Sequence, residues 1–383
     1  MVVKTKKLYI YECALRRFAD IWMEAKSQSI MLESYAMNGG DGPYSYAQNS
    51  LYQRGLMEAA KGMINEEIAM KLDIQELSLA ASEPIRIADL GCSCGPNTIL
   101  AVQHIIDALK RKFQSHSTPE FQVFFNDHVS NDFNSLFASL SVLGKQYYAA
   151  SAPGSFHGRL FPKATVHFVY SSYALNWLSK VPERVVDKTD PAWNQGRIHY
   201  TGAPKEVLEA YSDQYAKDID SFLQARVKEL APGGLMALLI PAVPDVITDP
   251  QITIGSEFKL VGSCLMDMAK LGMVSEAKVD TFNLPIYFTY PKELRQIIEE
   301  NGCFSIERME VLNIPKQHIV MPDLRQRMLY IRAILEPLIK NHFGNEIIDQ
   351  LFEIYSRKLS ESSIFLNPEC QKTTAIFLLL KPI

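Results

Sequence analysis

The sequence has few cysteines, no long apolar run and no excess of basic residues, and each absence excludes a class of protein. The six cysteines among its 383 residues lack the spacing of a disulfide framework or a zinc site, so we expect reduced thiols in a cytoplasmic protein. No apolar run approaches the roughly 20 residues that span a bilayer, so no membrane association is expected. A formal net charge of −4 argues against nucleic acid as a partner.

A hydrophobic content of 47% predicts one large globular domain with a shorter segment in front of it. Residues 1–34 mix basic and acidic side chains and contain no continuous apolar region, unlike a signal or transit peptide. We interpret them as an amphipathic, loosely ordered N-terminal extension. The domain is then predicted to comprise residues 35–383.

The strongest local signal lies in residues 85–98. A short run of apolar residues predicts a buried parallel strand, which turns through small residues into a helix with apolar side chains at helical spacing from Ile99 onward. Such a unit brings backbone N–H groups close to a ligand. Asp89 at the end of the strand would repel a diphosphate, which favours a neutral or cationic ligand such as a sulfonium nucleoside. The turn also lacks the Gly-x-Gly-x-x-Gly spacing of dinucleotide-dependent oxidoreductases. A plain tight turn is the alternative.

Two further strands, over residues 121–125 and 165–170, are predicted to end at the same edge of the sheet. Groups just past the carboxyl ends of parallel strands face the ligand crevice of an open α/β sheet. Asp127 follows the first of them and is the predicted ribose ligand, with a solvated loop acid as the alternative. The second is followed by side-chain donors on an apolar wall, unless the tryptophan is a core residue: Tyr173, Asn176 and Trp177. Phe156, after a Pro-Gly-Ser turn, is predicted to meet an adenine ring.

The order of elements predicts an α/β fold with a doubly wound sheet. Repeated strand–helix units continue through a helix over residues 204–230 and a strand over 235–240, and strands over 304–312 and 373–380 close the sheet with an antiparallel C-terminal edge strand. Helices over 258–272 and 325–357 do not fit the sheet and predict a helical cap over the strand tips. The core is therefore expected in residues 60–255 and 300–383, and the interleaved cap in about 180–200, 256–300 and 323–360.

Six blocks of residues, in order, resemble the SABATH family of plant methyltransferases, which use S-adenosylmethionine to methylate small acids and some purine alkaloids. The resemblance covers roughly residues 35–383 and is strongest to the loganic acid branch. The blocks include Ser45-Tyr46-Ala47-Gln48-Asn49-Ser50, Asp89-Leu90-Gly91-Cys92-Ser93, Phe125-Asn126-Asp127, Pro153-Gly154-Ser155-Phe156, Ser172-Tyr173-Ala174-Leu175 and Phe282-Asn283-Leu284-Pro285.

The resemblance implies a Rossmann-like methyltransferase fold, a homodimer and a role for each matching residue. Gln53 and Trp177 would hold the acceptor carboxylate as the catalytic residues, while Tyr173 and Asn176 shape the pocket. Asn38 stands where many salicylate-type members have a lysine, so that cationic contact is missing. The methyl donor would be held by Tyr46, Ser50, Asp89, Cys92, Asn97, Asp127, His128, Ser155 and Phe156. A magnesium ion, present in some members, would match Asn194, Asp280, Phe282 (through its carbonyl) and Asn283.

The expected reaction needs no general base, because a carboxylic acid with a pKa near 4 is already ionised at pH 7. The sequence therefore predicts an S-adenosylmethionine-dependent O-methyltransferase of a small acid, such as a loganic, salicylic, benzoic or jasmonic acid. Two alternatives are N-methylation of purine alkaloids and non-catalytic binding of a small molecule. Asn176 and His199 would tolerate a hydroxylated acceptor, whereas a flat aromatic pocket could be lined by Met266, Met268 and Tyr287.

Overall fold

The computed structural model describes residues 36–77, 83–114, 119–142, 146–245, 254–313, 323–362, 365 and 374–383. These residues belong to one compact unit, Ala36–Ile383. The predicted N-terminal extension, Tyr35 at the start of the predicted domain, and two of the six cysteines (Cys13 and Cys370) lie outside the described residues. In the described part of the chain, no helix is long and apolar enough to cross a membrane.

Seven strands of the described chain form one sheet, in the order β3-β2-β1-β4-β5-β7-β6. The first five pair in parallel, and β7 runs antiparallel to both β5 and β6. The predicted fold class is confirmed, and the antiparallel C-terminal strand lies one place inside the edge. The strands are β1 (Ile85–Leu90), β2 (Phe121–Asn126), β3 (Tyr148–Ser151), β4 (Val166–Ser172), β5 (Leu230–Ala242), β6 (Phe304–Asn313) and β7 (Thr374–Pro382).

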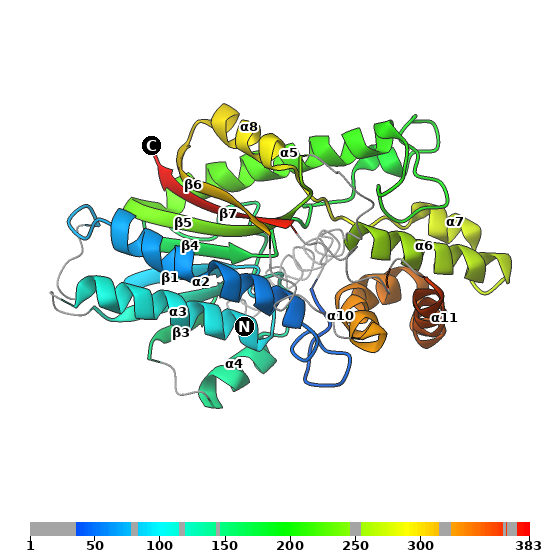
Figure 1. The fold of residues 1–383 in the computed structure, drawn as a ribbon, viewed down its shortest axis with the longest axis horizontal. Helices are drawn as coiled ribbons and strands as arrows, with labels where there is room; N and C mark the ends of the chain where they lie inside the picture. Colours follow the sequence, from blue (N-terminus) through cyan, green and yellow to red (C-terminus); the bar gives the residue numbers. More distant parts are fainter. Residues whose placement is uncertain are drawn as a thin grey trace, which may run out of the picture. The chain divides into compact units, whose positions relative to one another are not determined.

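Helices cover both faces of this sheet (Figure 1). One face carries α2 (Leu51–Lys71) and α3 (Pro96–Phe113), and the shorter α4 (Phe133–Val142) packs beside α3. The opposite face carries α5 (Lys205–Glu229) and α8 (Pro291–Asn301). The strand-tip connection after β4 includes a short 3-10 helix, η1 (Glu183–Val185).

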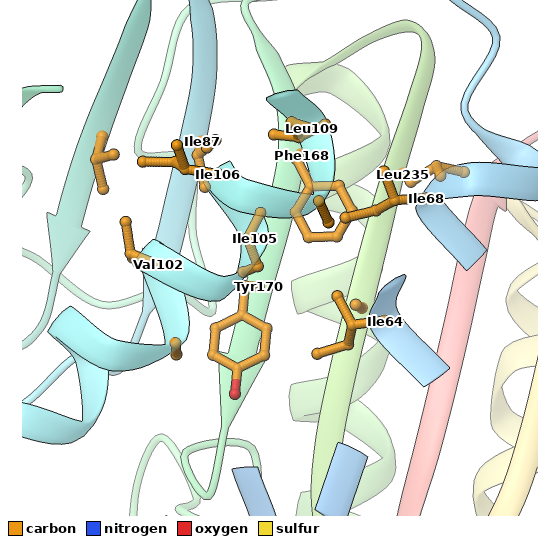
Figure 2. Close-up of a cluster of buried hydrophobic side chains, with 14 of the residues drawn as sticks. Ile64, Ile68, Ile87, Val102, Ile105, Ile106, Leu109, Phe168, Tyr170 and Leu235 are labelled. Atoms are coloured by element: carbon orange, nitrogen blue, oxygen red, sulfur yellow. The ribbon is translucent and has the colours of Figure 1, made fainter. Parts of the chain in front are cut away.

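The core on the first face shows why α3 forms where the sequence predicts it. Val102, Ile105, Ile106 and Leu109 recur at helical spacing and are fully buried against side chains of the sheet, as Figure 2 shows. Burying one such side chain contributes roughly 1.5–3 kcal/mol. Because α3 starts directly after the tip of β1, this packing fixes the turn between them.

The remaining helices form the cap and lie beyond the carboxyl ends of the parallel strands (Figure 1). They pack on one another rather than on the sheet, with α11 against both α10 and α6. This arrangement places the cap above the strand tips, where the predicted site residues lie. The cap helices are α6 (Ile254–Lys270), α7 (Glu276–Thr281), α10 (Leu324–Phe343) and α11 (Ile348–Glu361).

Two predicted boundaries are wrong. The single helix predicted over 325–357 is divided into α10 and α11, because Gly344 at φ +104° ends the first of them. The strand predicted from residue 235 starts instead at Leu230, so the Pro-Gly-Gly turn lies within β5. Gly233 at φ +74° forms an irregularity there, and the pairing with β4 shifts register nearby.

Candidate active site

The tips of β1 and β2 are joined by backbone hydrogen bonds. Gly91 and Cys92 both donate their N–H groups to the carbonyl oxygen of Asn126, at 2.9 Å each. Ser93 N donates to Asp127 Oδ2 and His128 N to Asp127 Oδ1, both at 2.7 Å. The turn after β1 and the acid after β2 are thus one hydrogen-bonded unit, as the sequence predicts for a shared edge.

Two carboxylates in this unit are held in an environment that disfavours their charge. Asp89 is 3% exposed and accepts a hydrogen bond from Thr98 Oγ1, yet burial raises its pKa to about 7. Burial also raises the pKa of Asp127, despite the hydrogen bond from Ser93 N. A cationic ligand between them would offset this cost, because an opposite charge favours the ionised carboxylate. Burial likewise raises the pKa of the Cys92 thiol, which is therefore neutral and a poor nucleophile.

A loop over residues 36–50 closes one side of this unit. Asn97 at the start of α3 donates from Nδ2 to Ser50 O at 2.9 Å and to Ser50 Oγ at 3.0 Å. Its Oδ1 accepts from Arg54 Nε at 3.1 Å. A narrow cavity lies between the loop and β1, and it brings together five of the predicted residues: Tyr46, Gln53, Asp89, Cys92 and Asn97.

The loop after β3 closes the other side. Gly154 N donates to Asp127 O at 2.9 Å, which ties this loop to the tip of β2. The Phe156 ring packs edge-on against Phe222 of α5 with centroids 6.2 Å apart, and it lies near Gly91. Ser155 is exposed beside it. Phe156 is therefore a firmly held wall, whereas Ser155 offers a solvent-accessible hydroxyl.

The first residues of the segment after β4 pack against the turn that follows β1. A Cβ atom added to Gly91 would lie 2.2 Å from Ala174 Cβ, so only glycine allows this approach. Tyr173 has a φ of +57°, and its ring meets Tyr52 of α2 edge-on at 5.6 Å. The Tyr52 ring in turn lies 5.4 Å from Tyr330 of α10. A row of aromatic rings thus connects the sheet, α2 and the cap.

Two buried amides in this region have oxygen atoms without a hydrogen-bond partner among the described residues. They are Gln53 Oε1 and Asn176 Oδ1, on side chains that are 7% and 6% exposed. Unpaired buried polar atoms are costly and commonly mark places where a ligand binds. Trp177, half-buried, forms an isolated β-bridge with Ile286, which holds this segment against the chain after α7.

The suggested contact of His199 with the acceptor is not supported by its surroundings. His199 is 2% exposed, and its two ring nitrogens lie 2.8 Å from Thr201 Oγ1 and 3.1 Å from Ile286 O. Burial lowers its pKa to about 3, so the ring is neutral. Met268 and Tyr287 are buried too, and Tyr287 Oη donates to Glu293.

The four predicted magnesium ligands lie close to one another, with Asp280 on the cap helix α7 and the other three in connecting segments beside it. Asn194 Nδ2 donates to Asn283 Oδ1 at 2.7 Å, and Gly196 N donates to Asp280 Oδ1 at 2.8 Å. Asn194 Oδ1 is buried without a partner among the described residues. With the Phe282 carbonyl, the set offers only oxygen donors, which suits a hard cation such as Mg²⁺. The described residues contain no cluster of three or more His, Cys, Asp or Glu side chains.

The sequence interpretation missed residues that complete the site. Thr98 holds the Asp89 carboxyl group, and its position in the first turn of α3 was a signal that went unused. Tyr52 and Tyr330 could not be found from local patterns, because they meet only in the folded chain. A second cavity of about 810 Å³ is lined by Arg86 and His167, at the starts of β1 and β4, and by Ser151 at the end of β3, and contains none of the predicted site residues.

Comparisons with known proteins agree with this geometry. Residues 32–382 match the family described as SAM dependent carboxyl methyltransferase. The loganic acid O-methyltransferase of Catharanthus roseus is 44% identical over 353 residues, covering 91% of this chain and 95% of the relative. A solved structure of a loganic acid methyltransferase with SAH superimposes with a TM-score of 0.85, covering 90% of this chain and 98% of that one.

Other relatives are similar over comparable lengths. The farnesoic acid carboxyl-O-methyltransferase of Arabidopsis thaliana is 41% identical, covering 86% of this chain and 93% of the relative. A 3,7-dimethylxanthine N-methyltransferase of Camellia sinensis var. assamica is 34% identical, covering 94% of this chain and 100% of the relative.

Proposed function

The chain belongs to the family of S-adenosylmethionine-dependent carboxyl methyltransferases, and from that premise we propose that its acceptor is a hydroxylated carboxylic acid of the loganic acid type. The chain is an enzyme that transfers a methyl group to a carboxylate. The identity of the acid and the roles of individual residues are the proposal. The observation that carries it is the pair of unpartnered buried amide oxygens of Gln53 and Asn176.

The donor site is proposed to consist of the joined tips of β1 and β2 with the two loops that close them. When bound, S-adenosylmethionine supplies an electrophilic methyl group on a sulfonium. Asp127 would accept hydrogen bonds from the ribose, and Phe156 would form a wall against the adenine ring. Asp89 would face the cationic part of the donor, which supports the ionised form of this buried carboxylate. Tyr46, Ser50, Cys92, Asn97, His128 and Ser155 complete the proposed contacts.

The acceptor site is proposed to lie between the segment after β4, the start of α2 and the cap. Gln53 and Trp177 would donate to the carboxylate and hold one of its oxygens in line with the methyl carbon, while Tyr173 borders the pocket. Uncharged hydrogen-bond donors orient the carboxylate without pairing it to a fixed buried cation, which would lower the nucleophilicity of the carboxylate. Positioning of this kind supplies roughly 7–11 kcal/mol of barrier lowering in favourable cases.

Preference for a hydroxylated acid would come from the unpartnered amide oxygens. A hydroxyl group of the acceptor can donate to Gln53 Oε1 or Asn176 Oδ1, whereas a flat apolar acid would leave both atoms buried and unpaired. A site built to pair with substrate hydroxyls discriminates strongly against analogues that lack them. The family resemblance to loganic acid methyltransferases points to the same class of acceptor.

A panel of acids with isotopically labelled methyl donor, read by product mass, tests this proposal. It should contain loganic, salicylic, benzoic, jasmonic and farnesoic acids, together with xanthines as non-acid acceptors. We expect methyl ester formation to be fastest with loganic acid. Gln53→Ala and Trp177→Ala should each lower kcat/KM for that acid about 100-fold while SAH binding persists. Faster turnover of a flat aromatic acid, or near-normal turnover by both variants, would contradict it.

We further propose that Mg²⁺, when bound, is held by Asn194, Asp280, Asn283 and the Phe282 carbonyl. Its charge would hold the connections around α7 together beneath the cap. Thermal unfolding measured with and without millimolar Mg²⁺ tests this without reference to activity. Wild type should gain stability with Mg²⁺ and not with K⁺, and Asp280→Asn should abolish the gain; equal behaviour of the two proteins would refute the site.

The homodimer and the cytoplasmic location are proposals that rest on the family resemblance and on the reduced-cysteine interpretation. Light scattering coupled to size exclusion would give the mass of the particle in solution, with two 43.3 kDa chains expected. Fractionation of cells that express a tagged chain would locate it. A monomer, or a tagged chain in a membrane or organelle fraction, would contradict these proposals.

A further inference from the structure

The loop over residues 36–50 contacts the cap as well as the donor site. The guanidinium carbon of Arg332, on α10, lies 3.6 Å from the centroid of the Tyr44 ring. The loop and α10 are also joined by a backbone hydrogen bond, in which Asn38 N donates to Ala333 O at 3.0 Å. Figure 1 shows the loop, at the start of the coloured chain, running beside α10. We call these two contacts, Tyr44–Arg332 and Asn38–Ala333, the clasp.

Arg332 is held so that its face is presented to the tyrosine. Its Nε donates to Glu336 Oε2 at 2.6 Å and its Nη2 to Asp349 Oδ1 at 2.7 Å. The side chain is only 8% exposed, since Tyr44 covers it from one side and the Phe352 ring lies 5.3 Å from the guanidinium. Two carboxylates thus fix the plane of the guanidinium, which is the geometry that favours stacking on an aromatic ring.

Hydrogen bonds within the loop connect Tyr44 to Tyr46 at the donor site. The Asn38 side chain donates from Nδ2 to Tyr44 O at 2.9 Å, and Tyr46 N donates to Asn38 O at 2.8 Å. Tyr46 itself lines the cavity against Asp89. On the other side, Gly40 N donates to Asp132 Oδ2 at 2.8 Å, which ties the loop to the start of α4. The loop therefore bridges the cap and the sheet.

Access to the donor site requires this loop to move. The cavity between the loop and β1 has a volume of about 30 Å³, which is about the space of one water molecule. This space is too small for a nucleoside, so a nucleoside beside Asp89 requires side chains that line the cavity, Tyr46 of the loop among them, to shift and then close on it. When the loop closes, it makes the clasp contacts with α10 of the cap.

We propose that Arg332 is a positioning residue for methyl transfer: through Tyr44 it holds the loop closed over the methyl donor and couples that closure to the cap. The inference rests on the proposed donor site. Arg332 touches neither the donor nor the acceptor, and it acts on the fraction of molecules in which Tyr46 and Ser50 stand in the binding position. Apparent affinity falls in proportion to that fraction.

The test measures SAH binding by calorimetry and the steady-state constants of wild type, Arg332→Met, Tyr44→Leu and the double variant. Each single variant should raise the Kd for SAH and the KM for S-adenosylmethionine about three- to tenfold. At saturation kcat should stay within about twofold, because the bound donor restores the closed loop. The double variant should be no worse than either single one, since both remove the same contact.

Two matched variants separate the clasp from general stability. Tyr44→Phe retains the aromatic face and should bind SAH like wild type. Asp349→Asn weakens an ion pair of Arg332 whose carboxylate is 88% exposed, but it leaves the stacking in place and should change the Kd by less than about twofold. Unchanged Kd in Tyr44→Leu, or additive effects in the double variant, would overturn the proposal. Asp127→Ala tests the donor site separately. If Asp127→Ala binds SAH as tightly as wild type, the proposed donor site is wrong, whatever the clasp variants show.

Discussion

The proposed donor half and the proposed acceptor half of the site are built in different ways. At the tips of β1 and β2, backbone N–H groups and carbonyls hold one another and hold Asp127, so the positions follow from the turn geometry. On the acceptor side, positions depend on side chains that come from α2, the segment after β4 and α10. The first construction suits a ligand that stays the same, and the second allows the acceptor to change among relatives.

Gly91 is where the two halves meet, and its replacement should give the largest effect. Gly91→Ala places a Cβ at 2.2 Å from Ala174 Cβ and requires an alanine at φ +80°. Left-handed backbone costs about 1–2 kcal/mol for alanine and overpacking about 1–3 kcal/mol. We expect a loss of about 2–5 kcal/mol in the free energy of unfolding, measured by denaturant titration, together with loss of both SAH binding and turnover.

Two further variants separate the backbone cost from the contact. Gly272→Ala has the same left-handed conformation, at φ +73°, with open space around it, so it should lose only about 1–2 kcal/mol. Adding Ala174→Gly to Gly91→Ala removes the colliding atom and should recover about 1–3 kcal/mol. If Gly91→Ala is no less stable than Gly272→Ala, the two halves are not in close contact at this point.

Asp127→Ala should break the donor half and leave the acceptor half assembled. The change leaves the N–H groups of Ser93 and His128 without their acceptor and removes the proposed ribose ligand. We expect the Kd for SAH to rise about 100-fold, or about 2.7 kcal/mol, by calorimetry. Asp107→Ala, which removes a partly buried carboxylate on α3 far along the helix, is the control and should bind SAH like wild type. Tight binding by Asp127→Ala would place the ribose elsewhere.

The difference between a half held by backbone hydrogen bonds and a half held by side chains from distant elements also explains what the sequence could predict. Strand β1, its turn and α3 follow from local patterns, because apolar spacing and small residues there determine the backbone. The acid after β2 could be found by its place at a strand tip. The short, partly exposed strand β3 has no apolar run to mark it and went unpredicted.

Acceptor-side contacts are harder to predict because they join distant parts of the chain. Tyr52 and Tyr330 meet only once α10 is packed. His199 is a pocket residue by its sequence position, but both of its ring nitrogens are engaged in the interior. Neither fact has a local signature in composition or periodicity. Side-chain positions that depend on tertiary packing follow from the folded structure alone.

Asn176→Leu should change the acceptor half without disturbing the donor half. The leucine has the same branching and number of side-chain heavy atoms but removes the unpartnered Oδ1, so an acid hydroxyl that donates to this atom loses its partner. We expect kcat/KM to fall about tenfold for a hydroxylated acid and by less than about twofold for benzoic acid, with SAH affinity unchanged. An equal fall for both acids would show that Asn176 shapes the pocket without contacting a hydroxyl group.

The smallest expected effect concerns the protonation of Asp89 in the donor half. Because burial raises its pKa to about 7, this carboxyl group is largely neutral at pH 6 in the free protein. A donor that carries a positive charge binds the ionised form better, so binding releases a proton and affinity increases as pH rises. If only the ionised form binds, the Kd for S-adenosylmethionine, measured without acceptor, should fall about fivefold from pH 6 to pH 7 and less than twofold from pH 7 to pH 8.

Calorimetry in two buffers of different ionisation enthalpy measures that proton release directly at pH 6.5. Asp89→Asn should bind S-adenosylmethionine more weakly than wild type at pH 8, and it should lose most of the pH dependence. Asp127 acts on Asp89 electrostatically, and the pKa of Asp127 is itself raised, so any slope that persists in Asp89→Asn belongs to Asp127 and its neighbour His128. A wild-type affinity that is constant from pH 6 to pH 8 would mean that Asp89 is ionised before the donor arrives, and that the donor half, like the acceptor half, contains polar groups that await a ligand.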